Sequence, residues 1–188
     1  MIPLRRLSLL AVLWALLPAA QAATLDGELE VESAFINVAS GVYQLYARIK
    51  YPANDSIVVA LRDGVSLSYE LDCEIARERR YWFDAGLTAI TLRRELSFHA
   101  VSDRYIVREQ GAAEQASFPT LDAALEYLGR VDGWPILVSP QVRPATEYRV
   151  SVRARVRRGR LTDTLRVLLF WTNDWQRESE WYSWSLPR

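Results

Sequence analysis

Arginine side chains form the densest group of chemically active residues in the sequence. In EYRVSVRARVRRGR, alternate positions of one strand carry the first members of the group, and the others follow where that strand ends. The group consists of Arg149, Arg153, Arg155, Arg157, Arg158 and Arg160. Guanidinium groups bind phosphates and carboxylates through paired hydrogen bonds. The pattern predicts a binding surface for lipid phosphates, cell-wall carboxylates or an acidic partner; the alternative is a solvated strand face.

Aromatic residues form a second group near the carboxyl end, in the stretch FWTNDWQRESEWYSW. Exposed coplanar rings stack on sugars, and tryptophan or tyrosine beside basic residues is typical of a membrane interface. Both uses stay open beside a third, in which the rings pack over the end of a sheet. The candidate interaction residues are Trp175, Trp181, Tyr182 and Trp184, whereas Trp171 is expected in the core.

The sequence carries no recognisable catalytic or metal-binding pattern. His99 is the only histidine, and the chain has no GxSxG elbow, HExxH helix, Cys-x-x-Cys pair or EF-hand loop. Glu28, Glu30 and Glu32 alternate along one strand, so they share a solvated face and form no cleft. We therefore predict no catalytic residue, no cofactor and no bound metal.

The amino end has the form of a cleavable signal peptide over residues 1–22. Arg5 and Arg6 supply the charged start, and Ala20-Gln21-Ala22 forms the cleavage site. The apolar run between them is about 11 residues, too short to span a bilayer, which takes roughly 20. We expect a single periplasmic or secreted domain over residues 23–188, with no transmembrane span. Removing two of the 23 basic residues leaves 21 against 23 acidic ones, and this balance predicts no nucleic-acid partner.

Alternation with a period of two predicts β-strands with one wet face over most of the chain. The expected strands are residues 25–38, 43–51, 65–75, 87–98, 104–108, 136–139, 148–156 and 164–171. One segment has helical spacing instead, with Thr120 as its N-cap and Gly129 at its end. Residues 57–62 fit a strand nearly as well as a second helix. Cys73 lies on the apolar side of its strand, so a buried, inert thiol is expected.

These elements predict a mainly β protein with one inserted short α-helix. Two antiparallel sheets packed face to face bury alternating strands without crossover helices, so an antiparallel β-sandwich is the expected architecture. An immunoglobulin-like version is compatible with the strand pattern, although the cysteine and tryptophan landmarks of antibody domains are missing. A closed β-barrel is the alternative.

The order of several segments resembles a family of proteobacterial envelope proteins known as domain of unknown function 4390. The segments are FPTLDAALEYLG, WPILVSP, ATEYRVSVRARV and the W-x-x-x-W and SEW that follow, together with Tyr81-Trp82 and LRRELSFHAVSDRYIVRE. The resemblance covers residues 23–186. The stretch RLTDTLRVLLFW lacks the prolines that family members carry before the last strand. The family implies no catalytic residue or cofactor; its members are encoded near a membrane sensor kinase, which implies an accessory role in envelope signalling.

Three functions follow from these observations. The first is a non-enzymatic binding or accessory module whose partner is an envelope or inner-membrane protein such as a sensor kinase. The second is an envelope hydrolase of glycans or esters, which requires two carboxyl groups about 5 to 9.5 Å apart in a cleft. The third is a lipid carrier that holds an acyl chain between its sheets. The oligomeric state is not predicted.

Overall fold

A computed structural model describes residues 25–77, 85–138, 146–159 and 176–186. In chain order its elements are β1 Glu30–Ala39, β2 Val42–Lys50, α2 Asp55–Arg62, β3 Leu67–Arg77, β4 Ala85–His99, β5 Arg104–Glu109, β6 Gln115–Phe118, α3 Leu121–Gly129, β7 Arg130–Val138, β8 Tyr148–Arg158, β9 Gln176–Glu178 and β10 Tyr182–Ser185. The predicted strand at 164–171 and the signal peptide at 1–22 lie outside the described residues. No helix among the described residues is long and apolar enough to cross a membrane.

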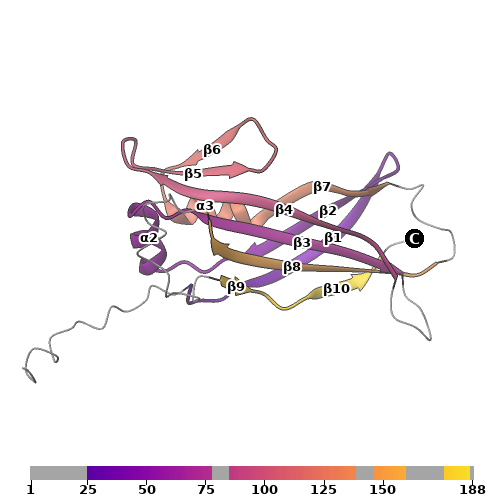
Figure 1. The fold of residues 1–188 in the computed structure, drawn as a ribbon. Helices are drawn as coiled ribbons and strands as arrows, with labels where there is room; N and C mark the ends of the chain where they lie inside the picture. Colours follow the sequence, from indigo (N-terminus) through magenta and orange to yellow (C-terminus); the bar gives the residue numbers. More distant parts are fainter. Residues whose placement is uncertain (1–24, 78–84, 139–145, 160–175, 187–188) are drawn as a thin grey trace, which may run out of the picture.

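The strands form two antiparallel sheets. The smaller sheet has the order β1-β2-β7, and the larger has the order β10-β8-β3-β4-β5-β6, with β9 also paired to β8. Figure 1 shows the two sheets running lengthwise, with α2 at one end and the β1–β2 turn at the other. The predicted antiparallel β-sandwich is therefore confirmed. The described strands do not close into a barrel, and the meander β3-β4-β5-β6 sets the fold apart from the immunoglobulin order.

The core lies between the inward faces of the two sheets. Along β3, the residues Leu67, Leu71 and Ile75 are at most 2 % exposed, because every second side chain of a strand points to the same side. Along β8, Val150, Val152, Ala154 and Val156 are fully buried in the same way. The opposite side chains of both strands face outward, so the sequence alternation positions a polar surface on the larger sheet.

Cys73 belongs to this inward row and is fully buried, as expected. Burial raises the pKa of its thiol to about 12, since the charged thiolate loses its hydration. Tyr51 and Tyr69 pack edge to face nearby, with ring centroids 4.8 Å apart. Burial also raises the pKa of both phenols. Because Cys73 is buried, its thiol is held in the protonated, unreactive form.

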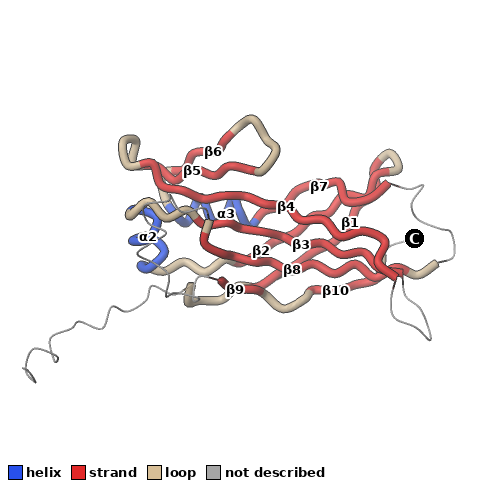
Figure 2. Tube along the Cα trace, in the orientation of Figure 1, coloured by secondary structure: helices blue, strands red, loops and turns tan. Residues whose placement is uncertain are grey.

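Both helices begin at side-chain caps. Asn54 Oδ1 accepts the backbone N–H of Ile57 at 2.9 Å at the start of α2, and Thr120 Oγ1 accepts that of Ala123 at 3.2 Å at the start of α3. Residues 57–62, left open between strand and helix, therefore belong to a helix that begins at Asp55. Figure 2 shows both helices toward the same end of the sandwich.

Several boundaries differ from the sequence prediction. β1 begins at Glu30, well after the predicted start at Leu25, and β7 begins at Arg130, directly after α3. The short strand β6 was not predicted, because its four residues are too few to establish a period. Arg94 joins α3 to the larger sheet: its Nη1 donates to the carbonyl of Arg130 at 2.9 Å and its Nε to Glu109 at 2.9 Å.

Candidate functional site

The outward face of the larger sheet has a buried carboxylate, Glu70, at its centre. Glu70 lies in the middle of β3, opposite Arg93 of β4 and Arg155 of β8 in the strand register, and is only 1 % exposed. Its Oε1 accepts Arg93 Nε at 2.7 Å and Arg157 Nε at 2.9 Å. Arg155 Nη1 lies 3.5 Å from its Oε2. Three guanidinium groups thus compensate one buried charge.

A second set of ion pairs continues along β8 from this centre. Arg155 Nη2 donates to Asp72 Oδ2 at 2.7 Å, and Arg155 Nε lies 3.0 Å from Glu178 of β9. Arg153 Nη1 lies 2.7 Å from the other oxygen of Glu178. We name Glu70, Asp72, Arg153, Arg155 and Glu178 the paired lattice. Its arginines are held by carboxylates of the neighbouring strands.

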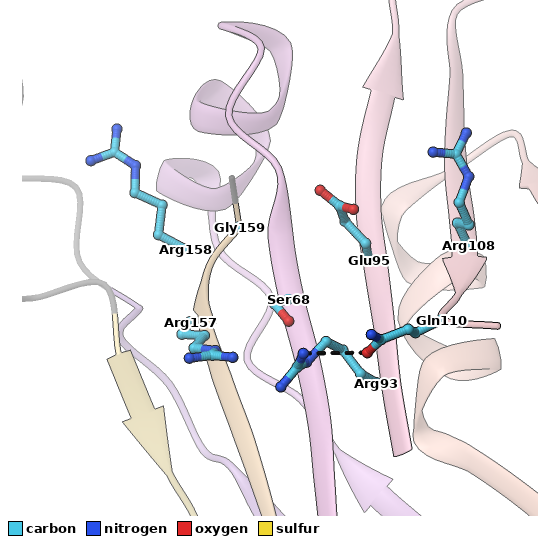
Figure 3. Close-up of a pocket in the computed structure, with 8 residues that line it drawn as sticks. All are labelled: Ser68, Arg93, Glu95, Arg108, Gln110, Arg157, Arg158 and Gly159. Atoms are coloured by element: carbon cyan, nitrogen blue, oxygen red, sulfur yellow. Dashed lines mark hydrogen bonds between the residues drawn. The ribbon is translucent and has the colours of Figure 1, made fainter. Parts of the chain in front are cut away.

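Beside the paired lattice lies a cavity of about 520 Å³. It is lined by Ser68, Arg93, Glu95, Arg108, Gln110, Arg157, Arg158 and Gly159. These residues come from the adjacent strands β3, β4 and β8 and from β5 with the residue that follows it. Figure 3 shows Arg93, Ser68 and Arg157 gathered at one level, with Glu95 and Arg108 farther along their strands. We call this space the arginine cavity.

Strand register explains why these side chains meet. Ser68 lies opposite Glu95 on one side and opposite Arg157 on the other, and Glu95 lies opposite Arg108. All four side chains therefore point to the outward face. Gly159 lies close to β3 and donates its N–H to the Ser66 carbonyl at 2.8 Å. A Cβ at this glycine would come within 2.3 Å of Ser66 Oγ, so the end of β8 approaches β3 only with glycine there.

The residues that line the cavity include four arginines and one glutamate, so the lining is positively charged, although Figure 3 shows the Arg158 guanidinium directed away from the other side chains. Arg93 and Arg157 each bond to Glu70 through part of their fork, and Arg93 Nη1 also donates to Gln110 Oε1 at 3.2 Å. Arg108 donates to Gln115 at 3.1 Å. Partial burial lowers the pKa of the Arg158 guanidinium, although arginine remains charged at neutral pH.

Glu95 differs from Glu70, Asp72 and Glu178, the carboxylates of the paired lattice. It forms no hydrogen bond or ion pair with any described residue, although Arg108 lies directly opposite it in the register. Figure 3 shows its carboxylate extending into the cavity rather than toward the Arg93–Gln110 bond. The cavity therefore combines several cationic donors with one carboxylate whose oxygens have no donor.

The structure places the described members of the predicted arginine group at three positions along β8; Arg160 lies outside the described residues. Arg153 and Arg155 belong to the paired lattice, whereas Arg157 and Arg158 line the cavity. Arg149 lies on the outward face at the far end of β8, opposite Ser185 of β10. The predicted group thus contains only half of the cavity's arginines.

The predicted aromatic residues lie along another edge of the same sheet. The Trp181 ring lies under Arg153, whose Cζ is 4.5 Å from the ring centroid, and Tyr182 contacts Trp184 edge to face. Trp181 and Tyr182 are more than a third exposed, while Trp184 packs partly against the core. Trp175 lies outside the described residues. The structure therefore does not bring the described aromatic residues to the arginine cavity.

Sequence reasoning missed Arg93, Glu95, Arg108 and the role of Glu70. Their strands were predicted, and alternation indicated which side each residue faces, but the pairing of β4 and β5 with β3 cannot be derived from single strands. His99 lies at the β4–β5 turn, where its Nδ1 is 2.9 Å from Ser102 Oγ. The described residues contain no group of acidic, histidine and cysteine side chains that could hold a metal ion.

Comparison with known proteins gives one match. A family model described as "Domain of unknown function (DUF4390)" matches residues 26–185. A search of the curated proteins and a search of the solved structures each found no match. The match covers both sheets and every residue of the arginine cavity.

Proposed function

The chain belongs to this family of domains of unknown function, and from that premise we propose that it is a non-enzymatic binding module that recognises an anionic ligand. The arginine cavity carries the proposal, because Arg93, Arg108 and Arg157 line it from three strands of one sheet face. Guanidinium forks match the geometry of phosphate and carboxylate groups. The lining retains more positive than negative charge, which favours an anion as the occupant.

The cavity has the size of a small-molecule site. Its volume of about 520 Å³ falls within the range of roughly 300 to 1,000 Å³ that is typical of ligand pockets. The space between the sheets near Tyr51 and Leu128 measures only about 10 Å³, which is room for about one water molecule. The dimensions therefore favour a polar ligand on the outward face over an acyl chain between the sheets.

A binding role fits the carboxylates better than hydrolysis does. The oxygens of Glu70 accept from Arg93 and Arg157, so this carboxylate is committed to ion pairs rather than to proton transfer. Glu95 extends into the cavity without a second carboxyl group among the lining residues. A glycosidase needs two carboxyl groups flanking the bond that breaks.

The cellular setting of the proposal rests on the sequence. The signal-peptide pattern at residues 1–22 supports a periplasmic or secreted protein. In that setting an envelope or inner-membrane protein, such as a sensor kinase, is the partner that we propose for the ligand-bound module. The exposed Trp181 and Tyr182 are a second surface that such a partner can contact.

Isothermal titration with inorganic phosphate at low salt tests the proposal. Arg108→Gln removes a cavity guanidinium, and Arg104→Gln is its matched control, because Arg104 lies on the same face of β5 but bonds to Ser117 instead. We expect equal affinity for the wild type and R104Q, and an affinity about 10-fold lower for R108Q. Absence of binding to the wild type, or equal losses in both variants, would contradict the proposal.

A further inference from the structure

Glu95 gives the arginine cavity a second chemical requirement. We propose that the cavity selects a phosphate-type anion that also carries a hydrogen-bond donor, of the aminoalkyl phosphate class, with Glu95 as the residue that recognises the donor. This inference rests on the proposed function, because the same cavity must first bind an anion. The ligand class follows from the charges in the site: the arginines match the phosphate, and Glu95 matches the donor.

The hydrogen bonds of the cavity separate Glu95 from its neighbours. Arg93 bonds to Glu70 and Gln110, and Arg108 bonds to Gln115 on β6. Glu95 receives a hydrogen bond from no described residue, although arginines of β4, β5 and β8 line the same cavity. Glu95 is only partly buried, so water can occupy its acceptor sites, and a ligand that carries a donor can replace that water.

An anion without a donor does not explain a carboxylate at this position. The negative charge of Glu95 repels a purely anionic ligand in the same cavity, whereas the arginines of the lining attract that ligand. A ligand with a phosphate at one end and an ammonium at the other satisfies both sets of groups. The cavity, at about 520 Å³, has room for both ends, since ligand pockets of roughly 300 Å³ already hold small molecules.

The charge on the phosphate end follows from the same balance. The lining holds more arginines than carboxylates, and Glu70 offsets part of this positive charge by pairing with Arg93 and Arg157. A phosphate monoester supplies nearly two negative charges and several acceptor oxygens, more than a single carboxylate. The arginines of the lining stand on three strands, β4, β5 and β8, and the oxygens of a phosphate can bond to more of them than the two oxygens of a carboxylate can.

Calorimetric titration of Glu95→Gln with two probes tests the inference. O-phosphoethanolamine carries a phosphate and a donating ammonium, and inorganic phosphate lacks the ammonium. We expect the wild type to bind O-phosphoethanolamine more tightly, with E95Q lowering that affinity about 10-fold and raising the affinity for inorganic phosphate several-fold. O-phosphocholine is the matched ligand control, because its quaternary ammonium has charge but no N–H.

The possible results separate the inference from the function on which it rests. If E95Q changes the affinity of both probes in the same direction, or if phosphocholine binds as well as phosphoethanolamine, the role of Glu95 is wrong while anion binding stands. If the wild type binds neither probe, both proposals fail. Vesicles of phosphatidylcholine with and without phosphatidylethanolamine identify the source: binding only to the latter indicates a lipid headgroup, and binding only to O-phosphoethanolamine indicates a soluble ligand.

Discussion

The outward face of β8 carries arginine at successive positions, Arg153, Arg155 and Arg157, yet the surroundings of these residues differ. Arg153 and Arg155 contact Asp72 and Glu178, which neutralise them within the paired lattice. Arg157 lies farther along the same face, pairs with Glu70 of β3 and lines the arginine cavity. The neighbouring strands make the difference, because β9 places the carboxylate of Glu178 opposite Arg155 and only the amide of Gln176 opposite Arg157.

The comparison shows that an arginine-rich strand is neither a binding surface nor a solvated face as a whole. Where β3 and β9 present carboxylates, the arginines stabilise the sheet. Where β4 and β5 present Glu95 and Arg108 instead, positive charge remains available for a ligand. We therefore expect substitutions in the paired lattice to lower stability and substitutions in the cavity to lower binding.

Glu70→Gln is expected to have the largest effect. The substitution removes the charge that holds Arg93, Arg155 and Arg157, and breaking a buried ion pair in this way costs about 3 kcal/mol of unfolding free energy. Glu95→Gln is the control on the same face, and we expect a change within about 0.5 kcal/mol because Glu95 has no partner to lose. Urea unfolding measures both. Equal losses in the two variants would remove the distinction between lattice and cavity.

Arg155→Gln should lower stability with little effect on binding, whereas Arg108→Gln should lower binding. Arg155 is a part-buried guanidinium bonded to Asp72 at 2.7 Å, and its loss should cost about 1.5 kcal/mol of unfolding free energy. Phosphate affinity should change little in R155Q and fall about 10-fold in R108Q. Thermal unfolding and calorimetric titration of the two variants provide the comparison; a binding loss in R155Q as large as in R108Q would refute it.

Tyr69 provides a contrast on the inward side of β3, next to Glu70. Its hydroxyl has no hydrogen-bond partner among the described residues, and burial raises its pKa. The unfolded chain then loses the phenolic proton first, so stability falls as pH rises above about 10. Tyr69→Phe should be neutral or stabilising by about 1 kcal/mol at pH 7 and should reduce the alkaline loss. Urea unfolding at pH 7 and pH 10.5 measures both effects. If Tyr69→Phe leaves the pH dependence of stability unchanged, Tyr69 is not the source of the alkaline loss.

Trp181→Leu should have the smallest effect. The ring lies 4.5 Å from the Arg153 guanidinium and is 39 % exposed, and a cation–π contact at such a site contributes about 0.5 to 1 kcal/mol. Phosphate binding should not change, since Trp181 is not part of the cavity lining. Differential scanning calorimetry measures the first effect and titration the second. Weaker phosphate binding in this variant would extend the site toward β10.

The sequence predicted the elements better than the site. Alternation identified the inward and outward sides of β3 and β8, because apolar side chains fill the inward face and polar side chains the outward face. Thr120 marked the start of α3. The cavity depends on the pairing of β3 with both β4 and β8 and on the approach of Gly159 to Ser66, which are contacts between distant segments. The arginine group was visible in the sequence, but the carboxylates that divide it lie on other strands.

Arginine side-chain NMR during a phosphate titration tests the division of this face most directly. The Nε–H signals of the arginines, assigned through single glutamine variants, should respond differently: that of Arg108 should shift as phosphate enters the cavity. Those of Arg153 and Arg155 should stay in place, because Asp72 and Glu178 already occupy them. Shifts of equal size along the whole of β8, or no shift at Arg108, would contradict the account.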